Sequence, residues 1–131
     1  MIYVDSNIPM YLVGAQHPNK QRVVGLISQL LAAHERLVTS AETFQEIIHR
    51  YLALRDRVHL NAAYEALETI VSVVVDVTKG DVDEARSASG SYVGLSSRDC
   101  LHLAAMHRLG CDKIWSYDTG FDAVPAIQRV H

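Results

Sequence analysis

The chain has 131 residues, of which 49% are hydrophobic and 21% are charged. This composition is typical of a folded globular protein and excludes an intrinsically disordered chain, and the length favours a single domain, residues 1–131, with a buried core. The formal net charge of −3 excludes the basic surface that most nucleic-acid-binding proteins carry, unless bound metal ions supply positive charge locally.

The sequence shows no sign of a targeting or membrane segment. The N-terminus lacks a basic stretch followed by an apolar run, and the longest apolar runs are too short to cross a bilayer. Cys100 and Cys111 have no CxxC spacing, so we interpret both as reduced thiols. Together these features predict a cytoplasmic protein without a membrane partner.

The first half of the sequence predicts strands that alternate with helices. Met1 to Val4 is a short apolar run typical of a buried strand, and Pro9 suits the first turn of the helix that follows it. Thr39 and Glu42 match a capping box, which predicts that a helix begins near residue 41. We expect strands at residues 1–4 and 36–38 and helices at residues 20–34, 41–55 and 59–70.

The second half continues this alternation. Residues 71–77 are rich in valine and predict a strand, whereas the small polar residues from 87 to 97 predict an exposed loop. Ser96 can cap a helix together with Asp99, and Gly110 can end that helix in the left-handed conformation. We also expect a short helix at residues 81–87 and strands at residues 113–116 and 127–130.

This alternation predicts a three-layer α/β/α sandwich with a central, mainly parallel sheet, because parallel neighbouring strands are joined by right-handed crossover helices. In such sheets, sites form at the carboxyl ends of the strands, where the strand order reverses. Asp5 and Asp118 each follow a predicted strand closely. We therefore expect both carboxylates at that end of the sheet.

Four acids stand in comparable positions, and each has a structural explanation of its own. Asp5 is explained as a helix cap, Asp99 as half of a capping box and Asp118 as a turn residue. Glu46 is explained by an ion pair with Arg50 one helical turn later. As a set, however, four clustered carboxylates repel one another, and hard divalent cations such as Mg²⁺ or Mn²⁺ relieve that repulsion.

Four segments of the sequence carry a family resemblance: Val4–Asn7, Thr39–Glu46, Arg98–Ala105 and Ser116–Asp122. Across the whole chain they resemble PIN-domain nucleases, and among these the VapC-type toxins of bacterial toxin–antitoxin modules. The resemblance implies a PIN-like fold with a catalytic acidic quartet. The implied catalytic residues are Asp5, Glu46, Asp99 and Asp118, of which Asp5, Asp99 and Asp118 are metal ligands. The implied supporting residues are Ser6, Asn7, Ser116 and Asp122.

The resemblance also implies an activity and partners. The activity is that of a Mg²⁺- or Mn²⁺-dependent endoribonuclease, in which an ion-activated water hydrolyses an RNA phosphodiester bond. The partners are single-stranded or looped RNA, a cognate VapB-type antitoxin and a second copy of the chain in a homodimer. Arg98 is a candidate phosphate contact and Tyr92 a candidate stacking residue. The helices at residues 20–34 and 41–55 provide either a partner surface or only core-facing residues.

Several alternatives stay open at this point. Two of them keep the PIN fold: a nuclease of RNA processing, and a module that binds RNA or protein without cutting. A response-regulator-type phosphoacceptor is disfavoured because Asp5 has no acidic neighbour, and a haloacid-dehalogenase-type phosphatase because position 7 is Asn. His102 and His107 are five residues apart, which is not the spacing of a zinc helix. We interpret His102 as a helix residue near the acids.

Overall fold

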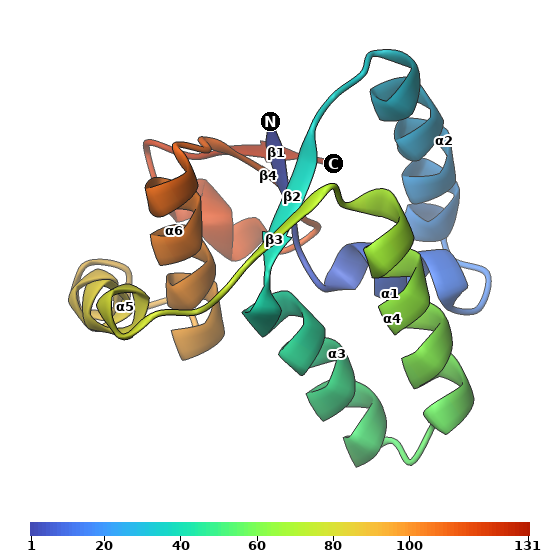
Figure 1. The fold of residues 1–131 in the computed structure, drawn as a ribbon, viewed down its shortest axis with the longest axis horizontal. Coiled ribbons are helices and arrows are strands. Elements are labelled where there is room, and N and C mark those ends of the chain that lie inside the picture. Colours follow the sequence, from blue (N-terminus) through green and yellow to red (C-terminus); the bar gives the residue numbers. More distant parts are fainter.

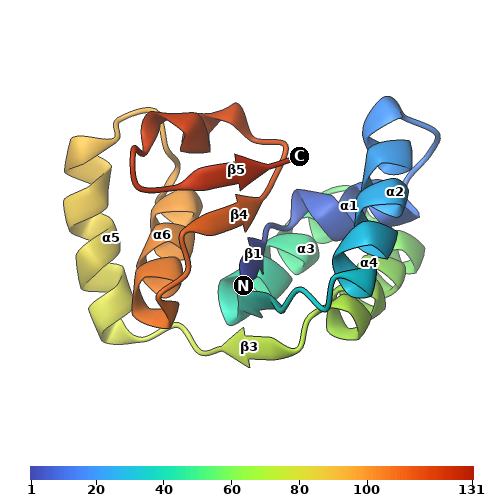
Figure 2. The same cartoon turned by 90° about the horizontal axis from the view of Figure 1, so that it is seen from above.

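The computed structural model describes all residues from 1 to 131, and a five-stranded parallel sheet forms its centre (Figures 1 and 2). The strands are β1 (Ile2–Val4), β2 (Leu37–Ser40), β3 (Val73–Val75), β4 (Lys113–Trp115) and β5 (Gln128–Val130). The helices are α1 (Asn7–Val13), α2 (Pro18–Ala32), α3 (Ala41–Ala53), α4 (Arg57–Ile70), α5 (Lys79–Ser91), α6 (Ser97–Leu109) and the 3₁₀ helix η1 (Thr119–Ala123). The predicted α/β fold with a parallel sheet is confirmed.

Helices cover both faces of this sheet. Ile2 and Val4 of β1 belong to one apolar cluster, and Tyr3 between them belongs to another on the opposite face. Helices α1 to α4 contribute to the first cluster and α6 to the second, with α5 packed on the outside of α6 (Figure 2). The central strands are therefore buried on both sides, as in a three-layer sandwich.

The strand order reverses between β1 and β4. The order across the sheet is β3-β2-β1-β4-β5, so the chain builds outward from β1 to β3 and then returns to the other side of β1. Val4 lies opposite Trp115, and the N–H of Asp5 donates to the Trp115 carbonyl at 3.1 Å. The residues that follow the two strands, Asp5 and Ser116, thus emerge together in the crevice where open α/β sheets bind ligands.

The capping box predicted at the start of α3 is wrong. The N-cap residue is Ser40, and its side chain makes no cap hydrogen bond. Thr39 lies in β2, where its hydroxyl donates to the carbonyl oxygen of Val4 at 2.8 Å and lies 2.7 Å from the hydroxyl of Thr43. These tertiary contacts, which connect β1, β2 and α3, replace the local contact with Glu42 that the sequence pattern predicted.

The valine-rich strand is shorter than predicted, and the helix after it is longer. β3 contains only three residues at the edge of the sheet, and Val74 is 47% exposed. α5 continues to Ser91, through small polar residues that predicted a loop. A capping box between Thr78 and Asp81 starts α5, and buried Ala85 packs in the interior. The small side chains let α5 lie close to α6, which stabilises a helix that its composition alone does not favour.

The predicted capping box and terminal glycine of α6 are confirmed. Ser96 and Asp99 form the capping box that starts α6, and Gly110 ends the helix with a φ of 67°. Cys100 and Cys111 are buried free thiols. No helix in the structure combines the length and the apolar character that a membrane crossing requires.

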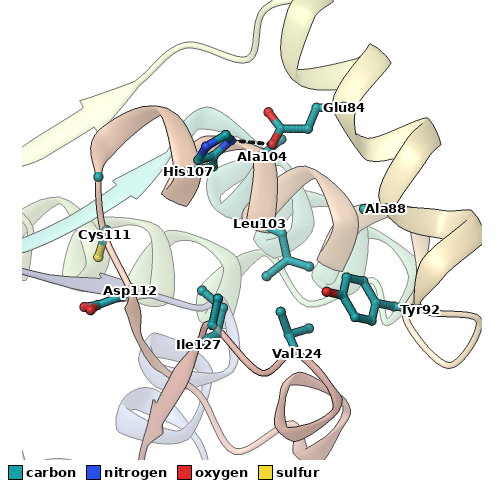
Figure 3. A pocket seen from close by; sticks show the side chains of 12 residues that line it. Glu84, Ala88, Tyr92, Leu103, Ala104, His107, Cys111, Asp112, Val124 and Ile127 are labelled. Atoms are coloured by element: carbon teal, nitrogen blue, oxygen red, sulfur yellow. Dashed lines mark hydrogen bonds and ion pairs between the residues drawn. The ribbon is translucent and has the colours of Figure 1, made fainter.

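A cavity of about 350 Å³ lies between α5, α6 and the segment that leads into β5 (Figure 3). Leu103, Val124 and Ile127 give it an apolar wall, and Tyr92 lies among them. None of the four acids of the predicted quartet lines this cavity. Tyr92 therefore contributes to apolar packing in a part of the molecule that the acids do not reach.

Candidate metal centre

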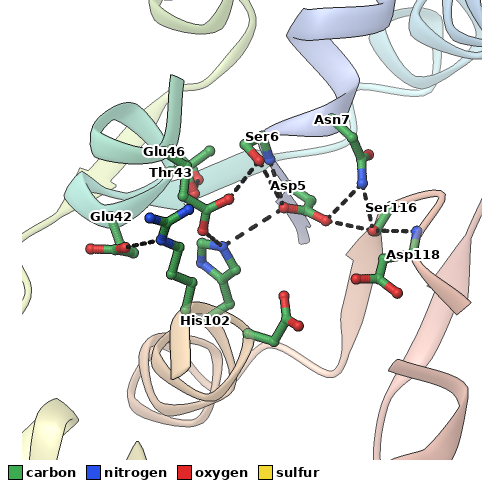
Figure 4. Close-up of polar contacts among 12 residues, drawn as sticks. Asp5, Ser6, Asn7, Glu42, Thr43, Glu46, His102, Ser116 and Asp118 are labelled. Carbon is green, nitrogen blue, oxygen red and sulfur yellow. Dashed lines mark hydrogen bonds and ion pairs between the residues drawn. The ribbon is translucent and has the colours of Figure 1, made fainter. Parts of the chain in front are cut away.

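Asp5 is buried at the carboxyl end of β1 (Figure 4). Its Oδ1 accepts a hydrogen bond from the Ser6 N–H at 2.7 Å, and its Oδ2 accepts from the Ser116 hydroxyl at 2.5 Å and the Asn7 amide at 3.0 Å. Burial raises the pKa of the Asp5 carboxyl, and the nearby His102 and the Ser116 hydrogen bond only partly oppose this rise. A cation next to Asp5 would therefore stabilise its ionised form.

Glu46 reaches the same crevice from α3. Its Oε2 accepts a hydrogen bond from the Ser6 hydroxyl at 2.6 Å, and its Oε1 lies 2.6 Å from Nε2 of His102. Burial raises the pKa of Glu46, but the contact with His102 and the Ser6 hydrogen bond outweigh it, and the pKa is lowered overall. No ion pair joins Glu46 to Arg50, so the structural explanation that the sequence offered for Glu46 is not found.

His102 is a fully buried member of this cluster. Its Nδ1 lies 2.8 Å from the hydroxyl of Tyr3, and its Nε2 lies 3.7 Å from Oδ1 of Asp5. Burial lowers the pKa of His102, but the surrounding Tyr3 and Glu46 raise it well above its ordinary value. The sequence placed His102 near the acids without assigning it a role, although its position one turn after Asp99 puts both residues on one helix face.

Asp5 and Glu46 offer carboxylate oxygens to a divalent cation, and His102 lies beside them. One ligand atom each of Asp5, Glu46 and His102 lie within 4.8 Å of one another. Oε1 of Glu46 and Nε2 of His102 form an ion pair, and Nε2 also lies 3.7 Å from Oδ1 of Asp5, but neither buried atom has a partner in hydrogen-bond geometry. Buried polar atoms of this kind are rare in folded proteins and point to an additional partner. Carboxylate oxygens suit Mg²⁺ and Mn²⁺, whereas imidazole suits softer transition metals.

Asp99 and Asp118 flank this set and do not join it. No group of three or more potential ligand atoms within 4.8 Å includes either residue. Oδ2 of Asp99 accepts from the N–H of Ser96, and Oδ1 of Asp118 accepts from the N–H of Gly120. The cap and turn functions expected of these two acids are thus present, and each leaves its second carboxylate oxygen free of hydrogen bonds within the chain. Figure 4 shows Asp118 beside Ser116, at the edge of the cluster.

Asp122 is connected to the crevice through the side chain of Arg129. Its carboxylate accepts two hydrogen bonds from Arg129, at 2.8 and 3.0 Å. Arg129 in turn donates to the carbonyl oxygen of Ser116 at 3.2 Å. The hydrogen bonds and charge of Arg129 lower the pKa of Asp122. Asp122 therefore supports the backbone of a residue that bonds directly to Asp5.

Arg98 and Glu42 form the outer edge of the cluster on the α3 and α6 side. Their side chains approach to 4.0 Å between Nε and Oε1, with Arg98 37% exposed. Burial raises the pKa of Glu42, and the charge of Glu46 raises it further. Glu42 is thus a fifth carboxylate near the crevice, which the sequence had explained as a helix cap, and the exposed Arg98 faces it.

Comparisons with known proteins agree with this fold. Residues 2–127 match the PIN domain. The chain is 46% identical over 130 residues to ribonuclease VapC13 of Mycobacterium tuberculosis, with 99% of each chain covered. Its structure is similar to that of VapC20 of M. tuberculosis, a toxin that cleaves the sarcin–ricin loop, with a TM-score of 0.74, 22% identity and 95% of each chain covered. A toxin–antitoxin complex from Klebsiella pneumoniae matches with a TM-score of 0.66, 14% identity and coverage of 98% of this chain and 96% of that chain. The chain therefore belongs to the PIN-domain family, and within it to the group of VapC ribonucleases.

Proposed function

We propose that this protein is a metal-dependent endoribonuclease of the VapC toxin type, which hydrolyses RNA phosphodiester bonds. The observation that carries the proposal is the close pair of carboxylates, buried Asp5 and partly buried Glu46, at the reversal of strand order in a parallel sheet. Relatives that are ribonucleases, at 46% identity over 99% of the chain, support the same activity. Cations held by the acids would also explain how a chain with a net charge of −3 acts on a polyanion.

The proposed catalytic residues are Asp5, Glu46, Asp99 and Asp118, with Asp5, Asp99 and Asp118 as the residues that would hold Mg²⁺ or Mn²⁺. Such an ion supplies an activated water and neutralises charge on the scissile phosphate. The free carboxylate oxygens of Asp99 and Asp118 support their assignment as ligands, because both acids already stand at the edge of the crevice.

The remaining polar residues hold these acids in place. Ser6 bonds to Asp5 through its N–H and to Glu46 through its hydroxyl, so one residue sets the spacing of two carboxylates. Asn7 and Ser116 fix the other oxygen of Asp5. His102 acts as a positioning residue for Glu46, because it is itself anchored by the Tyr3 hydroxyl. Residues held in this way by neighbouring hydrogen bonds lose little entropy when substrate arrives.

We propose a VapB-type antitoxin and a second copy of the chain as protein partners. The toxin–antitoxin complex among the structural neighbours supports the first of these partners. Exposed apolar side chains on α2 and α3 support a protein-binding surface. They are Val24 and Leu31 on α2 and Ile48 and Leu52 on α3.

The nuclease assignment is tested by incubating the purified protein with a mixture of unstructured and hairpin RNAs in Mg²⁺, in Mn²⁺ and in EDTA. We expect cleavage in either metal and none in EDTA. Asp99→Asn should abolish cleavage, whereas Asp112→Asn, the same change at an exposed acid away from the crevice, should leave it unchanged. Cleavage that persists in Asp99→Asn would refute the proposed ligand set, and metal binding by calorimetry without any cleavage would favour a non-catalytic RNA-binding PIN module.

A further inference from the structure

Helices α1 and α3 follow the carboxyl ends of β1 and β2 (Figures 1 and 2). A second pocket is lined by residues of α1 and of the C-terminal end of α3. Asn7, the first residue of α1, bonds to Asp5 and also lines this pocket, so one residue connects the pocket with the cluster. The volume is about 320 Å³, which is enough for one nucleobase. The lining residues are Asn7, Met10, Tyr11, Arg50, Tyr51 and Leu54, and we call it the α1–α3 pocket.

Arg50 gives the α1–α3 pocket an uncompensated positive charge. It follows Glu46 by four residues on α3, so it lies on the same helix face, displaced by about 6 Å along the axis. It is exposed and makes no ion pair with any acid of the chain, although Glu46 stands at the spacing where such a pair forms. A guanidinium group that is free, and one helical turn from the acids, is placed to donate paired hydrogen bonds to a phosphate.

Tyr11 gives the same pocket an aromatic surface. Its ring is held edge-on against Tyr117, with centroids 5.4 Å apart at 80°, and it lies 5.0 Å from the ring of His17. Tyr117 is connected to the acid cluster through Asn7, because its N–H donates to Oδ1 of Asn7 at 3.3 Å. A ring held in one position offers a surface on which an unpaired base of any type can stack.

We propose that the α1–α3 pocket binds the nucleotide next to the scissile phosphate of single-stranded RNA, with Arg50 on its phosphate and Tyr11 on its base. The inference rests on the proposed ribonuclease function. An RNA strand is favoured over a peptide because the pocket combines one free cation and a fixed aromatic ring beside an anionic crevice. This combination matches the alternating phosphates and bases of a polynucleotide.

RNA binding is measured separately from cleavage, by fluorescence anisotropy with a short, unstructured, labelled RNA in Mg²⁺. Asp99→Asn serves as the background in which the RNA stays intact. In that background, Arg50→Ala should weaken binding about tenfold. It should also reduce the slope of log affinity against log salt by about 0.7, the value for one lost phosphate contact on a single strand. Arg50→Lys should keep the slope.

Arg36→Ala is the matched control, because it removes the same charge just before the amino end of β2, at the opposite end of the strands from the acids. It should leave both affinity and slope unchanged. Tyr11→Leu should weaken binding at least fivefold without changing the slope, and Tyr11→Phe should bind as the parent does. This pattern separates the phosphate contact from the stacking contact, and thermal melting of each variant checks that it is folded.

The outcomes of the two assays are distinguishable. In one outcome the wild-type chain cuts RNA in Mg²⁺, but Arg50→Ala and Tyr11→Leu bind RNA with unchanged affinity and unchanged salt slope. The nuclease function then stands, the pocket assignment is overturned, and a peptide becomes the alternative occupant of the pocket. If the wild-type chain does not cut RNA but its binding shows the expected dependence on Arg50 and Tyr11, the pocket assignment stands and the nuclease function is overturned.

Discussion

Ser116 joins the ends of the two central strands, and its removal is the most direct test of how the centre is held together. Its hydroxyl donates to Oδ2 of Asp5 at 2.5 Å and accepts from the Asp118 N–H at 2.9 Å and the Asn7 amide at 3.2 Å. The residue is fully buried. Ser116→Ala deletes all three contacts while it adds no volume, so the change reports on hydrogen bonding alone.

The size of the effect follows from these contacts. A hydrogen bond to an ionised group contributes about 1.5–3 kcal/mol. The Asn7 amide keeps its bond to Asp5, so only part of the network is lost. We therefore expect Ser116→Ala to lower the free energy of unfolding of the metal-free protein by about 2 kcal/mol. Loss of a residue that orients a metal ligand weakens metal binding by about 10–100-fold, and we expect an effect in that range on Mn²⁺ affinity.

Urea unfolding in EDTA measures the first quantity, and calorimetric titration with Mn²⁺ measures the second. Ser72→Ala is a matched control, because the Ser72 hydroxyl donates to the carbonyl of Leu37 at 3.1 Å, at the amino end of β2. That variant should lose about 1 kcal/mol of stability and keep the Mn²⁺ affinity of the wild type. If Ser116→Ala also keeps the wild-type Mn²⁺ affinity, Asp5 is not oriented through Ser116 and the reasoning is wrong.

Two further predictions concern the scaffold. Asp81→Asn should lower the free energy of unfolding at pH 7 by about 1–2 kcal/mol, because buried Asp81 accepts two hydrogen bonds from Arg108 and caps α5. The Arg108 hydrogen bond lowers the pKa of Asp81, so this contribution is complete above the unfolded-state pKa of about 4 and is lost as the pH falls through the lower folded-state pKa. The difference between wild type and variant in urea titrations should thus shrink below pH 4, and a constant difference would contradict this account. Gly110→Ala should cost about 1–2 kcal/mol in thermal unfolding, since φ is 67° there, whereas Gly90→Ala, inside α5 with open space around the new methyl group, should stabilise the chain by a few tenths to about 1 kcal/mol. Equal effects of the two alanines would refute the conformational explanation.

The parts of the centre that follow from strand ends were predictable from sequence. Asp5 directly follows an apolar run, and a parallel sheet brings the carboxyl ends of its strands to one edge, so its position followed once the alternation of strands and helices was recognised. The cap of α6 was predictable for a similar reason, because Ser96 and Asp99 satisfy each other within one turn. The first case follows from the general topology of parallel sheets and the second from contacts within one helical turn.

Two local explanations, the Thr39 cap and the Glu46–Arg50 ion pair, fail because a distant partner replaces the local one. Thr39 matches the capping pattern, but its hydroxyl donates instead to the Val4 carbonyl of the neighbouring strand. Glu46 has Arg50 one turn away, yet its carboxylate turns to Ser6 and His102. His102 meets Tyr3 across a sequence separation of 99 residues. No spacing rule anticipates such contacts, because they exist only after the sheet has assembled.

A buried polar network beneath the acids explains how the scaffold holds carboxylates close together. The Tyr3 hydroxyl lies 2.7 Å from the Ser40 hydroxyl and 2.8 Å from Nδ1 of His102, so β1, β2 and α6 meet at one oxygen atom. The raised pKa of His102 favours its charged form, which offsets the negative charge of Glu46 at 2.6 Å. A buried hydrogen-bonded network favours one arrangement, because breaking it leaves polar groups buried without partners. The same contacts that compensate Glu46 therefore fix α3 and α6 relative to the sheet. The position of Glu46 at the site is thus set partly by hydrogen bonds in the core beneath it.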